Sequence, residues 1–158
     1  MGNKPGLAIQ VPGKVSLDLR HLVTDFTGTL SLDGVLLEGV EQRLRELAAL
    51  VDITVATADT FGTVREALAD LPIQVRLVGS GLDKANLVER LGRGRVVALG
   101  NGRNDVAMLD KAALSIAVFG PEGAAGELLA AADVVVREVN HALDLLLKPI
   151  RLAATLRP

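Results

Sequence analysis

Four short segments of the sequence carry the residue types that phosphoryl transfer requires. In the first, Asp25 follows the apolar run at residues 21–24 and precedes a Thr-Gly-Thr turn at residues 27–29. A carboxylate at a strand end can attack phosphorus as a nucleophile, and the backbone N–H groups of such a turn can hold phosphoryl oxygens. The structural alternative is an ordinary turn that Asp25 caps, and this segment alone does not decide between the two.

A hydroxyl group and an ammonium group follow further along the chain. Thr57 ends an alternating apolar run, and its hydroxyl can donate to a phosphoryl oxygen. In the structural alternative, Asp59 or Thr60 only caps the next helix. Lys84, at the start of a predicted helix, can neutralise charge on a pentacoordinate phosphorus, whereas most lone helical lysines are solvated. Taken alone, each of these two segments favours the structural alternative.

The fourth segment, Gly-Asn-Gly-Arg-Asn-Asp at residues 100–105, follows an apolar run and opens a predicted helix. Its small residues permit close approach of another group, and Asn101 and Asp105 offer the oxygen ligands that Mg²⁺ prefers. The alternative is a glycine turn with Asp105 in the first turn of the helix, where an acidic side chain is favourable in any case.

The elements that must position these residues alternate between short β-rich runs and helical segments. This pattern predicts an α/β fold with a mostly parallel central sheet flanked by helices. Ligands of such sheets bind outside the carboxyl ends of the strands, where we expect Asp25, Thr57 and Gly100 to converge. The expected strands are 21–24, 52–57, 73–78, 95–99, 113–118 and 134–136, and the expected helices are 39–50, 60–70, 83–91 (capped by Asp83), one from residue 104, 121–132 and 140–156.

We expect a single domain over residues 1–158. An N-terminal hairpin at about residues 5–19 turns at Pro12-Gly13, the core spans about 20–137, and C-terminal helices span about 138–156 with a break at Pro149. Residues 31–37 predict a short flap hairpin.

Composition excludes several classes of function. The chain has 158 residues, no cysteine and two histidines, which excludes disulfides, thiolate zinc sites, cysteine catalysis and a histidine metal cluster. The net charge of -2 argues against a nucleic-acid partner. No run of eighteen apolar residues is present, and the first residues do not read as a signal peptide. We therefore expect a cytoplasmic protein without a membrane partner.

Taken in order, the four segments resemble the motifs of the haloacid dehalogenase (HAD) superfamily, and within it the phosphorylation domain of P-type ATPases. Residues 25–29 match the first motif, which reads Asp-Lys-Thr-Gly-Thr in the ATPases. Residues 57–59 match the ATPase Thr-Gly-Asp motif, Lys84 matches the third motif, and residues 100–105 match Gly-Asp-Gly-x-Asn-Asp. The resemblance covers roughly residues 22–136 and is strongest to soluble P-type-ATPase-like HAD proteins.

The resemblance implies a Rossmann-like HAD fold and a phosphoaspartate at Asp25. It also implies Mg²⁺ as cofactor, held by Asp25, by the main-chain carbonyl of Thr27 and by the fourth motif. The residues that it assigns to phosphate binding are Gly28, Thr29, Thr57, Ala58 and Lys84, those that it assigns to the metal are Asp25, Thr27, Asn101 and Asp105, and those in supporting places are Asp59 and Asn104.

The sequence departs from phosphatases of the family at two places. Thr27 stands where an aspartate acts as general acid and base, a contribution of roughly 10²–10⁴-fold, so we expect slow hydrolysis or a long-lived phosphoenzyme. Asn101 stands where an aspartate binds the metal, and we expect Asp105 to compensate for the lost charge. The spacing between the motifs leaves no room for a cap or a nucleotide-binding domain, which excludes ATP-driven transport.

Three functions are consistent with these residues. The first is an Mg²⁺-dependent phosphohydrolase of a small phosphorylated molecule, with Asp25, Thr27, Thr57 and Lys84 as its catalytic residues. The second is a phospho-acceptor or regulatory module, which Thr27 favours. The third is a degenerate oligomeric scaffold, which Asn101 favours. We further expect a homo-oligomer, a dimer or tetramer, in which the N-terminal hairpin and residues 31–37 make contacts; the alternative is that both segments pack on their own domain.

Overall fold

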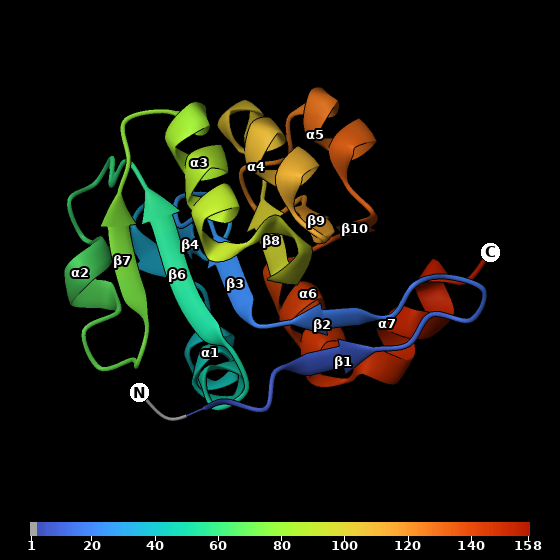
Figure 1. Ribbon diagram of the computed structural model, residues 1–158. Coiled ribbons are helices and arrows are strands. Elements are labelled where there is room, and N and C mark those ends of the chain that lie inside the picture. Colours follow the sequence, from blue (N-terminus) through green and yellow to red (C-terminus); the bar gives the residue numbers. More distant parts are fainter. Residues whose placement is uncertain (1–2) are drawn as a thin grey trace.

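A computed structural model describes residues 3–158. These residues form three layers, in which one sheet lies between two layers of helices (Figure 1). Residues 1 and 2, where the predicted domain begins and no signal peptide was expected, lie outside the described residues. The sheet has six strands in the order β10-β9-β8-β3-β6-β7, and every neighbouring pair is parallel. Its strands are β3 (His21–Thr24), β6 (Asp52–Thr57), β7 (Gln74–Leu77), β8 (Val96–Gly100), β9 (Leu114–Val118) and β10 (Val134–Val136). The predicted α/β fold with a parallel sheet is confirmed.

The strand order reverses beside β3, and this reversal places the motifs together. The chain runs from β3 outward through β6 to β7 and then returns to β8 on the other side of β3. Thr24 of β3 lies level with Val55 of β6 and Leu99 of β8. The residues after these three strands therefore meet at one edge, at the switch point where ligands of open α/β sheets bind.

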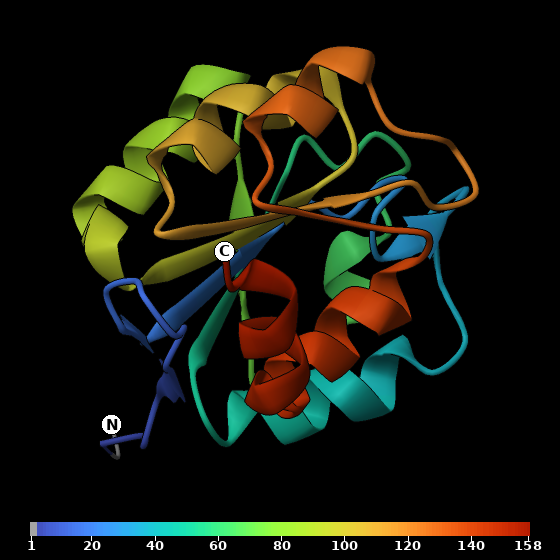
Figure 2. The same ribbon diagram turned by 90° about the vertical axis from the view of Figure 1, so that its right-hand side faces the viewer.

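Side chains of alternate residues along the strands enter two separate cores, because a strand points successive side chains to opposite faces. In β3, Leu22 joins the core under one helical layer and Val23 joins the other. Figure 2 shows the sheet between these two layers. One layer consists of α1 (Val40–Ala48), α2 (Val64–Ala67), α6 (Val139–Leu147) and α7 (Pro149–Leu156), and the other of α3 (Gly81–Leu91), α4 (Val106–Lys111) and α5 (Gly126–Ala131).

Two small antiparallel hairpins complete the fold. The N-terminal hairpin, β1 (Leu7–Ile9) with β2 (Leu17–Leu19), packs beside α7 and buries apolar side chains in the core on that face of the sheet. The flap hairpin, β4 (Ser31–Leu32) with β5 (Val35–Leu36), follows the Asp25 turn. Both hairpins were predicted from the sequence, and the N-terminal one packs on its own domain.

Three sequence predictions about helices need correction. The helix expected over 60–70 is the four-residue α2, and the one expected over 121–132 begins only at Gly126. Asp83 is not the cap of α3: the Ser80 side chain accepts from the Asp83 N–H (3.3 Å) and donates its hydroxyl to the Asp83 carboxylate (3.1 Å). A serine three residues before an acidic residue is the better cap, because each side chain can then satisfy the other residue.

The predicted break at Pro149 is confirmed, since Pro149 begins α7, where its missing N–H costs nothing. Among residues 3–158, no helix is long and apolar enough to cross a membrane.

Candidate active site

Asp25 lies directly after β3 and is only 6% exposed. Its backbone N–H donates to the Leu99 carbonyl of β8 (3.1 Å), which anchors it at the switch point. Its Oδ1 accepts from the Lys84 ammonium group (2.8 Å), and its Oδ2 accepts a long hydrogen bond from the Thr29 hydroxyl (3.4 Å). The residue predicted to be the nucleophile is therefore fixed by two contacts to its carboxylate and one to its backbone N–H, from three separate segments.

Lys84 extends from the inner face of α3 and is 1% exposed. Its Nζ donates to Asp25 Oδ1 (2.8 Å) and to Asp105 Oδ1 (2.7 Å). The alternative of a solvated helical lysine is thereby wrong. The structure brings Asp25, Lys84 and Asp105 into one buried cluster, which we call the charge triad.

Asp105 is fully buried, and both of its carboxylate oxygens are engaged. Oδ1 accepts from Lys84, and Oδ2 accepts from the N–H groups of Asn101 (3.1 Å) and Gly102 (3.0 Å). A Cβ at Gly100 would lie 2.6 Å from this carboxylate, so only glycine allows the approach. Oδ1 holds Lys84 and Oδ2 holds two N–H groups, so this geometry makes Asp105 the anchor of Lys84.

The charge triad influences the ionisation of Asp25. Burial and the neighbouring Asp105 raise the pKa of Asp25 to about 6, although Lys84 acts in the opposite direction. Burial alone would lower the pKa of Lys84, but Asp25 and Asp105 raise it above its ordinary value. Lys84 therefore stays positively charged, and its ammonium group favours the ionised form of Asp25 that a nucleophile requires.

Asn101 lies at the end of β8 beside Asp25. Its Oδ1 accepts from the Thr29 hydroxyl (3.1 Å), and its Nδ2 donates to the Gly123 carbonyl (3.0 Å). One hydroxyl has one proton, so Thr29 satisfies Asp25 Oδ2 and Asn101 Oδ1 only in turn. This pair of oxygens has unused acceptor capacity, which suits a hard divalent cation.

The residues present thus fit a divalent cation, although they do not form an acidic cluster. Within the described residues 3–158, no group of three or more His, Cys, Asp or Glu side chains converges as a metal site. The ligand set implied by the motifs contains one carboxylate, from Asp25, together with the neutral oxygens of Asn101 and the Thr27 carbonyl.

The turn after Asp25 is stabilised by its own backbone. The Phe26 carbonyl accepts from the N–H groups of Thr29 (3.2 Å) and Leu30 (2.9 Å), and the Gly28 N–H donates to the Ser31 carbonyl (3.0 Å). Thr27 is half-buried, and Gly28 has a φ of 78°. The N–H groups of Gly28 and Thr29 are therefore engaged inside the turn.

Thr57 ends β6, the neighbour of β3, and its side chain is buried. Its hydroxyl accepts from the Asp59 N–H (3.0 Å). Asp59 takes the capping alternative, because its Oδ1 accepts from the N–H groups of Thr63 (3.0 Å) and Val64 (3.1 Å) at the start of α2. Ala58, between them, is exposed.

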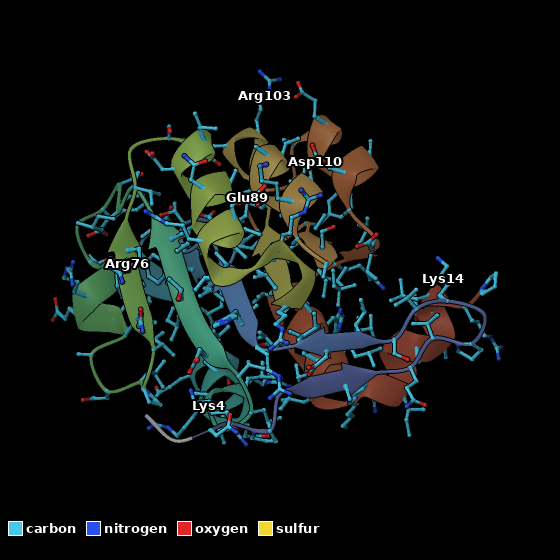
Figure 3. The ribbon with its side chains drawn as sticks, in the orientation of Figure 1. Lys4, Lys14, Arg76, Glu89, Arg103 and Asp110 are labelled. Carbon is cyan, nitrogen blue, oxygen red and sulfur yellow. The ribbon has the colours of Figure 1, made fainter. Side chains whose placement is uncertain are left out.

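The remaining residues of the fourth motif lie outside the charge triad. Asn104 is exposed, and its carbonyl lies so close to Gly81 that a Cβ there would be 2.6 Å away. Arg103 points outward at the same edge (Figure 3) and pairs with Glu127 (3.1 Å). Neither side chain joins Asp25.

Two features of the site region were not predicted from the sequence: the cap at Ser80, and the contact of the segment between β9 and α5 with the turn after Asp25. A Cβ at Gly28 would overlap the carboxylate of Glu122 and would lie 2.7 Å from Asn101 Nδ2. Glu122 therefore lies against the turn after Asp25, in a segment that was predicted to be helical. Its position directly after a strand, at the carboxyl edge of the sheet, is the signal that could have identified it.

A family comparison agrees with this geometry. The model for haloacid dehalogenase-like hydrolases matches residues 41–142, more than half of the chain. The chain belongs to the haloacid dehalogenase-like hydrolases, as the motifs predicted. The matched range begins after Asp25 and includes Thr57, Lys84 and Asp105.

Individual proteins share the sequence or the fold. An uncharacterized protein of Methanocaldococcus jannaschii is 48% identical over 63 residues, which are 40% of this chain and 68% of that protein. The cobalt-bound deoxy-D-mannose-octulosonate 8-phosphate phosphatase of Haemophilus influenzae has a TM-score of 0.70 at 17% identity, over 86% of this chain and 91% of that chain.

Two further structures show the same likeness. The 3-deoxy-D-manno-octulosonate 8-phosphate phosphatase of Moraxella catarrhalis, which contains magnesium and phosphate ions, has a TM-score of 0.64 at 16% identity, over 88% of this chain and 94% of that chain. A zinc-transporting PIB-type ATPase has a TM-score of 0.62 at 26% identity, over 77% of this chain and 20% of that chain. The likeness to the two phosphatases shows a shared fold.

Replacing Lys84 tests the structural role of the charge triad. Lys84→Met leaves two buried carboxylates without a counter-charge, and we expect the free energy of unfolding to fall by about 3–5 kcal/mol. Lys111→Met is the matched control, because Lys111 pairs with Glu89 near the surface (2.7 Å), where such a pair contributes under about 1 kcal/mol. Urea denaturation measures both variants, and equally small losses would contradict the triad's role.

Proposed function

We propose that the protein is a slow, Mg²⁺-dependent phosphohydrolase that acts through a phosphoaspartate at Asp25 on a small phosphorylated molecule. The observation that carries this proposal is the buried contact of Asp25 with Lys84, which Asp105 holds from the other side, at the switch point of the sheet. The family is one of hydrolases, and two of its structural neighbours are phosphatases, which supports the reaction class.

In the first step, a carboxylate oxygen of Asp25 attacks phosphorus. A new bond joins this oxygen to phosphorus, the bond between phosphorus and the leaving-group oxygen breaks, and the leaving group departs with the electron pair. Lys84 donates to Asp25 before attack and is placed to offset negative charge on the transferring phosphoryl group. Thr57, at the end of the adjacent strand, has the hydroxyl to orient a phosphoryl oxygen.

In the second step, the oxygen of a water molecule forms a bond to phosphorus, the bond between phosphorus and the Asp25 oxygen breaks, and Asp25 regains its carboxylate. Inorganic phosphate leaves, and the proton from the water passes to solvent. The attacking water must lose a proton, and the Thr27 hydroxyl is too weak a base to accept it. We therefore propose that this step limits turnover, because general base catalysis contributes about 10²–10⁴-fold where a carboxylate is present.

A Mg²⁺ ion held by Asp25, the Thr27 carbonyl and Asn101 would neutralise negative charge on the phosphoryl group. The unused acceptor capacity of Asp25 Oδ2 and Asn101 Oδ1 around the Thr29 hydroxyl supports this assignment.

The slow second step also supports a different function, that of a phospho-acceptor module. Such a protein takes a phosphoryl group from a small donor and holds it, and a threonine at position 27 would prolong its lifetime. The two functions share the first step and differ only in the rate of the second.

We also propose that copies of the chain form a homo-oligomer, a dimer or tetramer, over the edge of the sheet that carries the site. The Thr63 hydroxyl donates to the Gly34 carbonyl (2.8 Å) and ties the flap hairpin to its own domain. Val35, in that hairpin, is nonetheless 71% exposed. Exposed apolar side chains along this edge include Leu32, Val35, Phe61 and Leu82. A second copy would remove them from water.

Phosphate release from acetyl phosphate tests the first step. With Mg²⁺ present, we expect sustained release that disappears in Asp25→Asn and on removal of the metal by EDTA, with intact mass followed in parallel. A gain of one phosphoryl group with little release would instead identify a phospho-acceptor. Neither signal, even at high Mg²⁺, would contradict both functions and favour a scaffold.

Restoring the missing base tests the second step. Because Thr27 is half-buried and beside Asp25, we expect Thr27→Asp to accelerate phosphate release by about 10²-fold. Thr27→Asn is the control, because asparagine has the same shape as aspartate but no carboxylate that can act as a base. If the two variants release phosphate at the same rate, Thr27 is not what slows the enzyme.

A further inference from the structure

The proposed metal site has little negative charge of its own. Of the charge triad, Lys84 offsets one of the two carboxylates, and both oxygens of Asp105 are engaged. Asn101 contributes a neutral amide. A divalent cation at Asp25 would therefore meet only one unit of net negative charge from the triad.

Glu122 is a further carboxylate beside this site. It lies in the segment between β9 and α5, and its carboxylate contacts Gly28, the residue that follows the Thr27 carbonyl. The same position at Gly28 is 2.7 Å from Asn101 Nδ2, so Glu122 and Asn101 lie on the same side of the turn. Among residues 3–158, no hydrogen bond or ion pair to the Glu122 side chain is formed, so its charge has no counter-ion.

Backbone contacts on both sides of Glu122 fix its position. A Cβ at Gly120 would lie 2.9 Å from the Gly28 carbonyl oxygen, so the chain before Glu122 packs on the turn after Asp25. After Glu122, Asn101 Nδ2 donates to the Gly123 carbonyl (3.0 Å), and the Ala125 N–H donates to the Asn101 carbonyl (2.8 Å). The segment is thus attached directly to Asn101.

The amide of Asn101 does what an aspartate cannot. A carboxylate at this position has no proton to donate to the Gly123 carbonyl, and it would face that oxygen as a second acceptor. The asparagine therefore gives up a charge at the metal site and gains the contact that holds the segment carrying Glu122.

We propose that Glu122 supplies to the divalent cation the negative charge that Asn101 lacks, and that Asn101 positions the segment from which Glu122 does so. The inference rests on the proposed function, because it concerns the same metal site. It makes Glu122 a metal-affinity determinant outside the four sequence motifs. Glu122 is exposed, so its effect is electrostatic and screened by water.

Isothermal titration of Mg²⁺ into the substrate-free protein tests this inference without relying on turnover. A unit charge several ångströms from a divalent ion in a water-like dielectric changes the affinity by roughly tenfold. We expect Glu122→Gln to raise the Kd for Mg²⁺ by about that factor. Glu127→Gln is the matched control, since it removes the same charge from the neighbouring helix, where Glu127 pairs with Arg103; it should leave the Kd unchanged.

A second variant asks whether the charge itself matters. Adding Asn101→Asp to Glu122→Gln returns a carboxylate to the end of β8, and we expect it to recover most of the lost Mg²⁺ affinity. If the double variant does not regain Mg²⁺ affinity, the proposal that Glu122 replaces the charge missing at position 101 is overturned.

The outcomes separate this inference from the proposed function. If the wild-type protein and Glu122→Gln bind Mg²⁺ equally, Glu122 has no such role, while the proposed function stands. If the wild-type protein does not bind Mg²⁺ and Asp25→Asn behaves identically, both the metal-dependent function and this inference are overturned.

Discussion

A buried ammonium group between two buried carboxylates is the interaction on which the site depends. Removing ionised groups from water is costly unless they are paired with good geometry, and here Lys84 reaches Asp25 and Asp105 at 2.8 and 2.7 Å. The three residues come from the end of β3, from α3 and from the segment after β8. The pairing therefore fixes the relative positions of these elements. Asp25 can be buried in its ionised form only when all three elements are assembled around it.

The positions of Asp25, Thr57 and Gly100 could be predicted because each follows an apolar run of strand length. In a parallel sheet such residues share one edge, and the register of β3 with β6 and β8 confirms that they do. The identity of the triad was accessible only through the motifs, because a lysine in a helix carries no local sign that it is buried.

The rest depended on tertiary contacts that no local pattern encodes. Ser80 and Asp83 both have side chains that can cap a helix. Ser80 is the cap because α3 begins at Gly81. From the sequence, Asn101 could be interpreted only as a metal ligand without a charge. Its hydrogen bond to the Gly123 carbonyl could not be predicted, because Gly123 lies more than twenty residues away in the sequence. The alanine-rich residues 121–132 were interpreted as one helix, but residues 120–123 form a turn in which the Gly123 N–H donates to the Gly120 carbonyl (3.3 Å). Both glycines have a positive φ, which a helix does not allow, and this turn packs on Gly28 and Asn101.

In the proposed mechanism Asp25 carries the phosphoryl group, and chemical trapping of this intermediate would identify the modified residue. The protein is incubated with acetyl phosphate and Mg²⁺, quenched in acid and reduced with borohydride, which converts an aspartyl phosphate to homoserine. Peptide mass mapping then locates the reduced residue. The account predicts homoserine at position 25 and nowhere else. Reduction at another carboxylate, or phosphate release from an enzyme in which position 25 is never modified, would contradict it.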